Sequence, residues 1–250
     1  IDDSNHFMII LDDMSPTLSV DQFSGLTLEQ TRHGLVALAN LHSGTTNDDE
    51  LFGREWLNGT KAALAPLYQS ILPGLFTTFL DRFRHADADI LELVTNFAHR
   101  LPHYSAQASP YECVVHGDFR TDNLLFEGRG GEVPLAVVDW QTVSVSSPFL
   151  DVAYFLVTSL EPQLLLGAAD ELLDVYLEER SRLGSPIPRD AARSELARYA
   201  LQPVAMLVPA SVIVEQTDRG DRMIVEMLRR ATVICTAWKA LEELDHYVAA

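Results

Sequence analysis

The chain has few cysteines, few lysines and a large excess of acidic residues, and each of these features excludes a class of protein. Its two cysteines, Cys113 and Cys235, form neither a disulfide framework nor a metal-binding spacing in 250 residues. Lysine occurs only at Lys61 and Lys239, and 36 acidic residues face 18 Lys and Arg, so the formal net charge is −18. Such a field repels nucleic acid and anionic membranes, and it favours cationic ligands.

The sequence also lacks a long apolar run. The apolar stretch over residues 199–214 is too short to span a membrane and contains Pro203 and Pro209, so we expect a buried, kinked helix and its successor. The start, Ile-Asp-Asp-Ser-Asn-His, lacks the basic flank and apolar core of a signal peptide. With 47% hydrophobic and 22% charged residues, the composition predicts a globular, cytoplasmic protein without nucleic-acid or membrane partners. The oligomeric state is left open.

Residues 114–141 carry the most specific pattern. An apolar run, a polar loop, an apolar run, a glycine-rich turn and a third apolar run predict strand, loop, strand, turn and strand. The loop reads His116-Gly-Asp118 and then, after four residues, Asn123, which is the spacing of the kinase catalytic loop. Sixteen positions later, Asp139 ends an apolar run, where a kinase places its principal Mg²⁺ carboxylate.

This pattern resembles the aminoglycoside phosphotransferase and choline kinase-like superfamily, a branch of the protein-kinase fold. The sequences Asp139-Trp-Gln and Asp151-Val-Ala-Tyr-Phe-Leu are typical of its ecdysteroid kinase-like and bacterial phosphotransferase members. The resemblance is specific over residues 114–156 and fainter over residues 7–43. It implies an α+β, predominantly helical fold, the C-terminal lobe of a kinase, in which a small β-hairpin region carries the catalytic loop. It also implies that Asp151 is a buried residue that braces this loop.

The resemblance further implies an ATP-dependent (or GTP-dependent) kinase with Mg²⁺ as cofactor and a small-molecule alcohol as acceptor. Asp118 would be the catalytic base, and Arg120 would lie near the transferred phosphate. Asn123 and Asp139 would hold Mg²⁺, which prefers hard oxygen ligands. Without the resemblance, the sequence predicts only that the His-x-Asp segment forms a turn and that the Arg120 side chain faces solvent.

The N-terminal residues suggest a hinge. The apolar run over residues 7–11 predicts a strand, and an acidic pair and a Ser-Pro turn follow it. By resemblance, this is the last strand of the N-terminal lobe and the start of the adenine-binding hinge, so the domains would be residues 1–14 and a helical lobe of residues 15–250. Neither lysine lies in a Val-Ala-Ile-Lys-like strand, and we expect most of the small lobe to be absent from this sequence. The implied nucleotide-binding residues are Leu11, Asp12, Asp13 and Met14.

The remaining sequence predicts mainly helices. Thr27 and Gln30 fit a capping box that begins a helix ending near His42. Residues 52–80 contain Pro66, Pro73 and Gly74, which predict several short helical pieces. A clearer helix follows over residues 90–101, residues 144–148 read as a polar loop, and the last third reads as long amphipathic helices.

Two alternatives from other functional classes remain. The chain could be a non-catalytic binding module, a kinase-fold remnant that holds a ligand without turnover. It could also be a metal-dependent hydrolase that uses His116, Asp118 and Asp139, although two-metal sites need further His or carboxylate ligands at short spacing.

Overall fold

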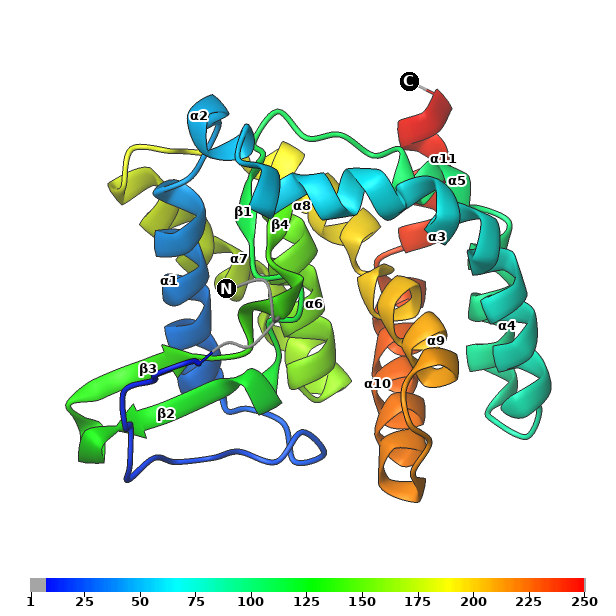
Figure 1. Ribbon diagram of the computed structural model, residues 1–250, viewed down its shortest axis with the longest axis horizontal. Coiled ribbons are helices and arrows are strands. Elements are labelled where there is room, and N and C mark those ends of the chain that lie inside the picture. Colours follow the sequence, from blue (N-terminus) through cyan, green and yellow to red (C-terminus); the bar gives the residue numbers. More distant parts are fainter. Residues whose placement is uncertain (1–7, 250) are drawn as a thin grey trace.

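The computed structural model describes residues 8–249, except for the side chains of residues 58–66, 68 and 249. The described chain is mostly helical with two small antiparallel sheets, which confirms the predicted α+β class (Figure 1). The helices are α1 (Leu28–Ser43), α2 (Asp49–Phe52), α3 (Glu55–Arg82), α4 (Ala88–Ala98), α5 (Leu101–Ser105), α6 (Phe149–Ser159), α7 (Pro162–Arg182), α8 (Arg189–Tyr199), α9 (Gln202–Ile213), α10 (Asp218–Ala237) and α11 (Ala240–Ala249). The strands are β1 (Cys113–Val115), β2 (Leu124–Gly128), β3 (Val133–Val137) and β4 (Ser144–Ser146).

The strand, loop, strand, turn, strand order predicted for residues 114–139 is confirmed. Strands β2 and β3 form an antiparallel hairpin with Leu124 opposite Val137, and the glycine-rich residues between them form its turn. The polar loop predicted for residues 144–148 was wrong in part. Residues 144–146 form strand β4, which pairs with β1. The Ser-Val-Ser sequence is too short and polar to show strand periodicity, so its structure depends on the partner strand.

Helix α6 lies at the centre of the core, and every residue in it except Leu150 is buried. It contacts α1, α7, α8, α9 and α10. Burial of each large apolar side chain contributes about 1.5–3 kcal/mol. The approach of α1 to α6 requires glycine at position 34, because a Cβ there would overlap the Phe155 ring. The core therefore fixes the position of α6, and with it that of Asp151 in its first turn.

Helix α1 begins with the capping box predicted from the sequence. The Thr27 hydroxyl accepts a hydrogen bond from the Gln30 N–H, and the Gln30 side chain accepts one from the Thr27 N–H. This cap satisfies two backbone donors that would otherwise lack intrahelical partners. The helix ends beside His42, which is fully buried.

The prediction of several short helices over residues 52–80 was wrong. A single helix, α3, runs through Pro66, Pro73 and Gly74. A proline inside a helix removes its own N–H donor and costs about 3 kcal/mol. Here Phe76 and Phe79 are buried, and their packing offsets that cost.

The strand expected over residues 7–11 is not formed by residues 8–11, and Phe7 lies outside the described residues. The side chains from Met8 to Leu11 are 69–87% exposed. Residues 8–13 make no backbone–backbone hydrogen bond to the described chain. A strand needs a neighbouring strand to pair its N–H and C=O groups, and the described residues place none beside this segment.

Within residues 8–249, the stretch Arg189–Ile213 is the one helical region with the length and composition of a membrane span. Its mean hydropathy is 1.4, and 61% of the apolar window is buried inside the protein, as in a core helix. The stretch comprises α8 and α9, and Pro209 lies within α9.

Candidate active site

The catalytic loop is held by the buried carboxylate of Asp151. Asp151 Oδ2 accepts a hydrogen bond from the His116 N–H at 2.6 Å, and Oδ1 accepts one from the Gly117 N–H at 2.8 Å. His42 Nε2 lies 3.3 Å from Oδ2, and its Nδ1 lies 2.8 Å from the Tyr176 hydroxyl. Burial lowers the pKa of His42, so its imidazole is neutral, donates from Nε2 and accepts at Nδ1. The two hydrogen bonds to the His116 and Gly117 N–H groups confirm the brace that the resemblance implied for Asp151.

Replacing Asp151 with asparagine is expected to lower the free energy of unfolding by about 2–4 kcal/mol, because an amide leaves one of the buried N–H donors unpaired. Urea unfolding followed by circular dichroism measures the change. The matched control is Asp174→Asn, which removes a half-exposed carboxylate paired with Arg189 and should cost less than about 1 kcal/mol. Equal losses in the two variants would contradict the bracing role.

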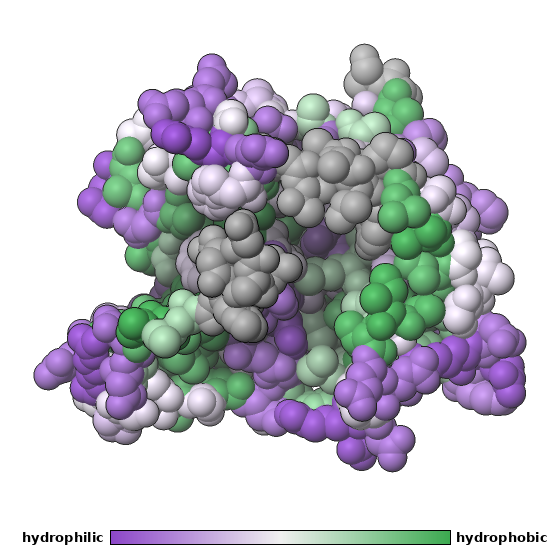
Figure 2. Space-filling model, viewed as in Figure 1, coloured by the Kyte–Doolittle hydropathy of each residue, from purple (hydrophilic) through white to green (hydrophobic). Residues whose placement is uncertain are grey.

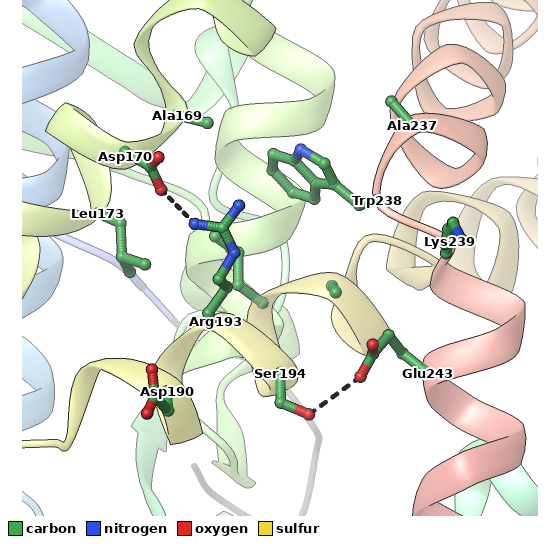
Figure 3. A pocket seen from close by; sticks show the side chains of 12 residues that line it. Ala169, Asp170, Leu173, Asp190, Arg193, Ser194, Ala237, Trp238, Lys239 and Glu243 are labelled. Carbon is green, nitrogen blue, oxygen red and sulfur yellow. Dashed lines mark hydrogen bonds and ion pairs between the residues drawn. The ribbon is translucent and has the colours of Figure 1, made fainter.

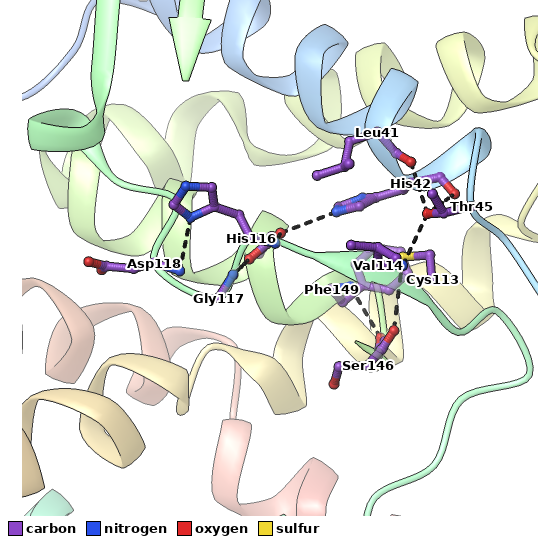
Figure 4. Close-up of polar contacts among 12 residues, drawn as sticks. Leu41, His42, Thr45, Cys113, Val114, His116, Gly117, Asp118, Ser146 and Phe149 are labelled. Carbon is purple, nitrogen blue, oxygen red and sulfur yellow. Dashed lines mark hydrogen bonds and ion pairs between the residues drawn. The ribbon is translucent and has the colours of Figure 1, made fainter. Parts of the chain in front are cut away.

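His116 and Gly117 fix the backbone of the loop. His116 Nδ1 accepts a hydrogen bond from the Asp118 N–H at 3.2 Å (Figure 4). Its Nε2 donates to the Val138 carbonyl at 3.0 Å. The imidazole therefore connects the Asp118 loop to the segment that carries Asp139. Gly117 has φ +84°, and a Cβ there would lie 2.5 Å from the Thr142 carbonyl oxygen. Only glycine fits this position.

Three of the predicted site residues come together at the end of the hairpin. Asn123 Nδ2 donates to the Asp118 carbonyl at 2.8 Å and to Asp118 Oδ2 at 3.1 Å. The Asn123 carbonyl accepts a hydrogen bond from the Val138 N–H at 3.0 Å, so Asp139 follows directly beside Asn123. Asp118 and Asn123 are 8% and 6% exposed, whereas Asp139 is exposed, with φ +65°. These contacts bring two carboxylates and an amide to one place.

The oxygens of this cluster have different partners. Asp118 Oδ1 is buried and forms no hydrogen bond within the described chain. The amide nitrogen of Asn123 is used by Asp118, which leaves its amide oxygen for another ligand. Asp139 has only a long contact, 3.4 Å, from Gln141 Nε2 to its Oδ2. The cluster can therefore accept a proton at Asp118 and offer hard oxygen ligands from Asn123 and Asp139.

Arg120 does not face solvent. Its Nε lies 3.2 Å from Asp118 Oδ1, and Nη1 lies 2.8 Å from Asp122 Oδ2. Nη1 also lies 3.7 Å from the sulfur of Met223 in α10. The guanidinium is thus a counter-ion beside Asp118, and it is 19% exposed.

Sequence reasoning missed Tyr154. It lies in α6 and is 1% exposed. Burial and then the negative charge of Asp118 raise the pKa of Tyr154 well above its usual value, so the phenol remains protonated beside the carboxylate. Its position in the Asp-Val-Ala-Tyr-Phe-Leu run was visible, but an apolar helix offers no local signal that one hydroxyl faces a catalytic loop.

The residues predicted to bind the nucleotide lie at the opposite end of the hairpin from Asn123. The Met14 carbonyl accepts a hydrogen bond from the Arg129 N–H at 2.8 Å, and Asp12 pairs with the Arg129 guanidinium at 3.2 Å. Asp13 contributes its carbonyl to Arg129 Nε at 3.3 Å. The neighbouring Leu11 is 80% exposed. The five residues of β2 separate this segment from the Asn123 end by about 13 Å.

A cavity of about 580 Å³ opens beside the catalytic loop. Gly117 and Thr142 line one end, β4 lines a side, and α3, α5 and α9 supply the other walls. Figure 2 shows this face of the molecule hollowed, with hydrophobic side chains gathered on the side of α3 and α9. The cavity could admit a small molecule to the vicinity of Asp118.

A second cavity, of about 340 Å³, is formed by α7, α8 and the junction of α10 and α11 (Figure 3). Its polar side chains contact one another: Arg193 pairs with Asp170 at 2.5 Å, and the Ser194 hydroxyl donates to Glu243 at 3.3 Å. Its lining comes entirely from residues 169–243, so it does not include the catalytic loop.

Across residues 8–249, no group of three or more His, Cys, Asp and Glu side chains is arranged to hold a metal ion. The hydrolase alternative required such additional ligands. A kinase-type Mg²⁺ site requires fewer, because the nucleotide phosphates and water complete the coordination. Asn123 and Asp139 are suitable for the second kind of site.

The comparisons with known proteins agree with this geometry. The family model described as ecdysteroid kinase-like matches residues 1–182, which include the catalytic loop, Asp139 and Asp151. The chain belongs to the ecdysteroid kinase-like family. The resemblance predicted from the sequence is confirmed, and membership of this family supports a kinase-like enzyme.

This ecdysteroid kinase-like chain is 31% identical over 137 residues to acyl-CoA dehydrogenase family member 10 of Mus musculus, covering 53% of the chain and 12% of that protein. It is 36% identical over 75 residues to acyl-CoA dehydrogenase family member 11 of Gallus gallus, covering 30% of the chain and 9% of that protein. The chain thus matches about a tenth of the length of these curated relatives.

Two solved structures are similar in arrangement to the ecdysteroid kinase-like chain. A choline/ethanolamine kinase family protein from Mesorhizobium loti has a TM-score of 0.45 and 15% identity, over 92% of this chain and 70% of that one. An ADP-bound aminoglycoside phosphotransferase has a TM-score of 0.40 and 14% identity, over 87% of this chain and 69% of that one.

Proposed function

We propose that this chain is the large lobe of a small-molecule kinase that transfers the γ-phosphate of ATP or GTP to an alcohol. The observation that carries the proposal is the environment of Asp118. Its Oδ2 accepts a hydrogen bond from Asn123, and its buried Oδ1 lies 3.2 Å from the Arg120 Nε in an ion pair without a well-aligned hydrogen bond in the described chain. The carboxylate is positioned and still has an oxygen that can accept a proton. Its neighbour Gly117 lines the large cavity.

In the proposed reaction, the acceptor hydroxyl binds against Asp118, which orients it and takes its proton as the bond to phosphorus forms. The bond from the γ-phosphorus to the bridging oxygen breaks, and the nucleoside diphosphate leaves with that oxygen. The transition state places negative charge on the phosphoryl oxygens, so positioning and charge supply most of the catalysis. Arg120 is beside Asp118 and can turn from this carboxylate towards the transferred phosphate. Tyr154 remains a neutral phenol, so it adds no second negative charge beside Asp118.

The proposed cofactor is Mg²⁺, held by the amide oxygen of Asn123 and the carboxylate of Asp139. When bound, it would offset the charge on the nucleotide phosphates. The conformation of Asp139 turns the chain sharply at the end of β3, which leaves its carboxylate exposed to a ligand. Leu11 and Met14, with the acidic pair between them, would contact the nucleotide base at the other end of the hairpin. The proposed partner is a small-molecule alcohol, and the proposed location is the cytoplasm.

The test is titration calorimetry of the 250-residue chain with ATP, in the presence and absence of Mg²⁺, followed by phosphorus NMR of mixtures with a panel of alcohols. Binding that requires Mg²⁺, together with transfer to an alcohol, would support the kinase. A folded protein that binds alcohols from the panel but no Mg²⁺-nucleotide would instead support the non-catalytic binding module.

A further inference from the structure

The cavity beside the catalytic loop points to a class of acceptor. We propose that the acceptor is an elongated, largely apolar alcohol that carries a single amino group at the end opposite its reacting hydroxyl. The identity of the reacting end rests on the proposed phosphotransfer function. The apolar body and the amino group are inferred from the cavity alone.

The cavity wall is mostly uncharged. Its described lining consists of apolar side chains, two tyrosines, three glutamines, several hydroxyl side chains and one carboxylate. The apolar members used here are Leu72, Leu101, Leu150, Ala205 and Met206. Such a wall binds hydrocarbon surface through the hydrophobic effect and fixes orientation with a few polar groups.

Glu112 is the one charged side chain among the described lining residues. It is half-buried, and among the described residues its carboxylate has no hydrogen-bond or ion-pair partner. The phenol of Tyr104 already donates to Gln202 Oε1 at 2.7 Å, so this tyrosine contributes mainly its ring to the wall. A single carboxylate in an otherwise uncharged wall pairs with one cation. An acceptor with several amino groups would bury unpaired charge, and an anionic acceptor would be repelled.

Strand β1 sets the distance between the two ends of the acceptor. Glu112 precedes β1 and Gly117 follows it, and both line the cavity. Five residues of extended chain span at most about 16 Å. Asp118, the proposed base, is the next residue after Gly117. The reacting hydroxyl and the amino group are therefore separated by about the span of residues 112–117, at most about 16 Å.

The experiment uses linear probes and titration calorimetry on the 250-residue chain without nucleotide. Aminododecanol, with its hydroxyl and amino groups at opposite ends, is the test ligand below its micelle-forming concentration. Dodecanediol has the same length without the charge, and aminopropanol has the charge without the length. We expect aminododecanol to bind about tenfold more tightly than either comparator.

The variant Glu112→Gln should abolish the preference for aminododecanol over dodecanediol while leaving the affinity for dodecanediol unchanged. The matched control is Glu132→Gln, at an exposed glutamate of the hairpin turn, which should retain the preference. The inference would be overturned if the unaltered protein bound aminododecanol and dodecanediol equally, or if Glu112→Gln kept the preference. It would also be overturned if none of the three probes bound.

These outcomes are separate from those that test the kinase. Probe binding needs neither nucleotide nor turnover, so it reports on the cavity alone. If aminododecanol binds through Glu112 but neither it nor any alcohol of the panel receives phosphate from Mg²⁺-ATP, the proposed function fails and the assignment of the cavity stands. If other alcohols are phosphorylated and aminododecanol does not bind, the proposed function stands and the assignment of the acceptor fails.

Discussion

The variant Asp118→Asn is expected to lower kcat for phosphoryl transfer by roughly 10²–10⁴-fold, the usual contribution of a positioned general base. The amide has the shape of the carboxylate, but it cannot accept the proton of the acceptor hydroxyl at the position of Oδ1. Phosphorus NMR of the reaction with the best alcohol from the panel measures the rate. Titration calorimetry with Mg²⁺-ATP should show that nucleotide binding is retained.

Asp122→Asn is the matched control for this variant. Asp122 lies in the same loop and also pairs with Arg120, but it is more exposed than Asp118. Its replacement changes the charge beside Arg120 by the same amount without removing the proposed base, so kcat should change only a few-fold. If Asp118→Asn retained the rate of the unaltered protein, the assignment of Asp118 would be wrong.

The second large effect is expected for Asp139→Asn, which should weaken Mg²⁺-dependent binding of ATP by about tenfold or more. The reason is that a neutral amide is a much poorer ligand for a hard dication than a carboxylate. Asparagine is a suitable replacement because it tolerates positive φ, here +65°, better than other residues do. The observable is the ratio of ATP affinities measured with Mg²⁺ and with a chelator.

Asp174→Asn provides the same change of charge on α7, in a side chain paired only with Arg189, and should leave that ratio unchanged. A ratio that was equally high in Asp139→Asn and in the unaltered protein would show that Asp139 does not hold the metal. Lower affinity both with Mg²⁺ and with the chelator would indicate damage to the nucleotide site and not to the metal site.

The arrangement of the His116–Asn123 loop could be predicted from the sequence because its interactions are local. Asp118 and Asn123 are five positions apart, and their side chains contact each other directly. Asp139 follows because the turn of a short hairpin returns the chain to the same end. Spacing along the sequence therefore almost determines the position of these three residues.

The cavity could not be predicted in this way. Its walls come from α3, α5, β4 and α9, which are brought together by packing over long separations in sequence. Glu112 has no motif around it, and its importance depends on the uncharged residues that surround it in space. The pairing of β4 with β1 was missed for the same reason, since neither three-residue strand is recognisable without its partner.

Helix α3 and residues 8–11 illustrate opposite errors. The prolines of α3 predicted breaks, but buried phenylalanines on one face keep the helix continuous. The apolar residues from Met8 to Leu11 predicted a strand. An apolar segment forms a strand only when a neighbouring strand pairs with its backbone N–H and C=O groups. In both cases, tertiary contacts decided the outcome and not local propensity.

The carboxylate of Asp151 also limits how the sequence can change over evolutionary time. It serves the end of α1, the catalytic loop and α6 together, although His42 and Asp151 are 109 positions apart. A substitution at Asp151 would leave buried donors in two other segments unpaired, and a substitution at His42 would remove a partner of this carboxylate. Across related chains, positions 42 and 151 should therefore covary, with both residues retained in chains that keep the His-Gly-Asp loop and replaced together in chains that have lost it.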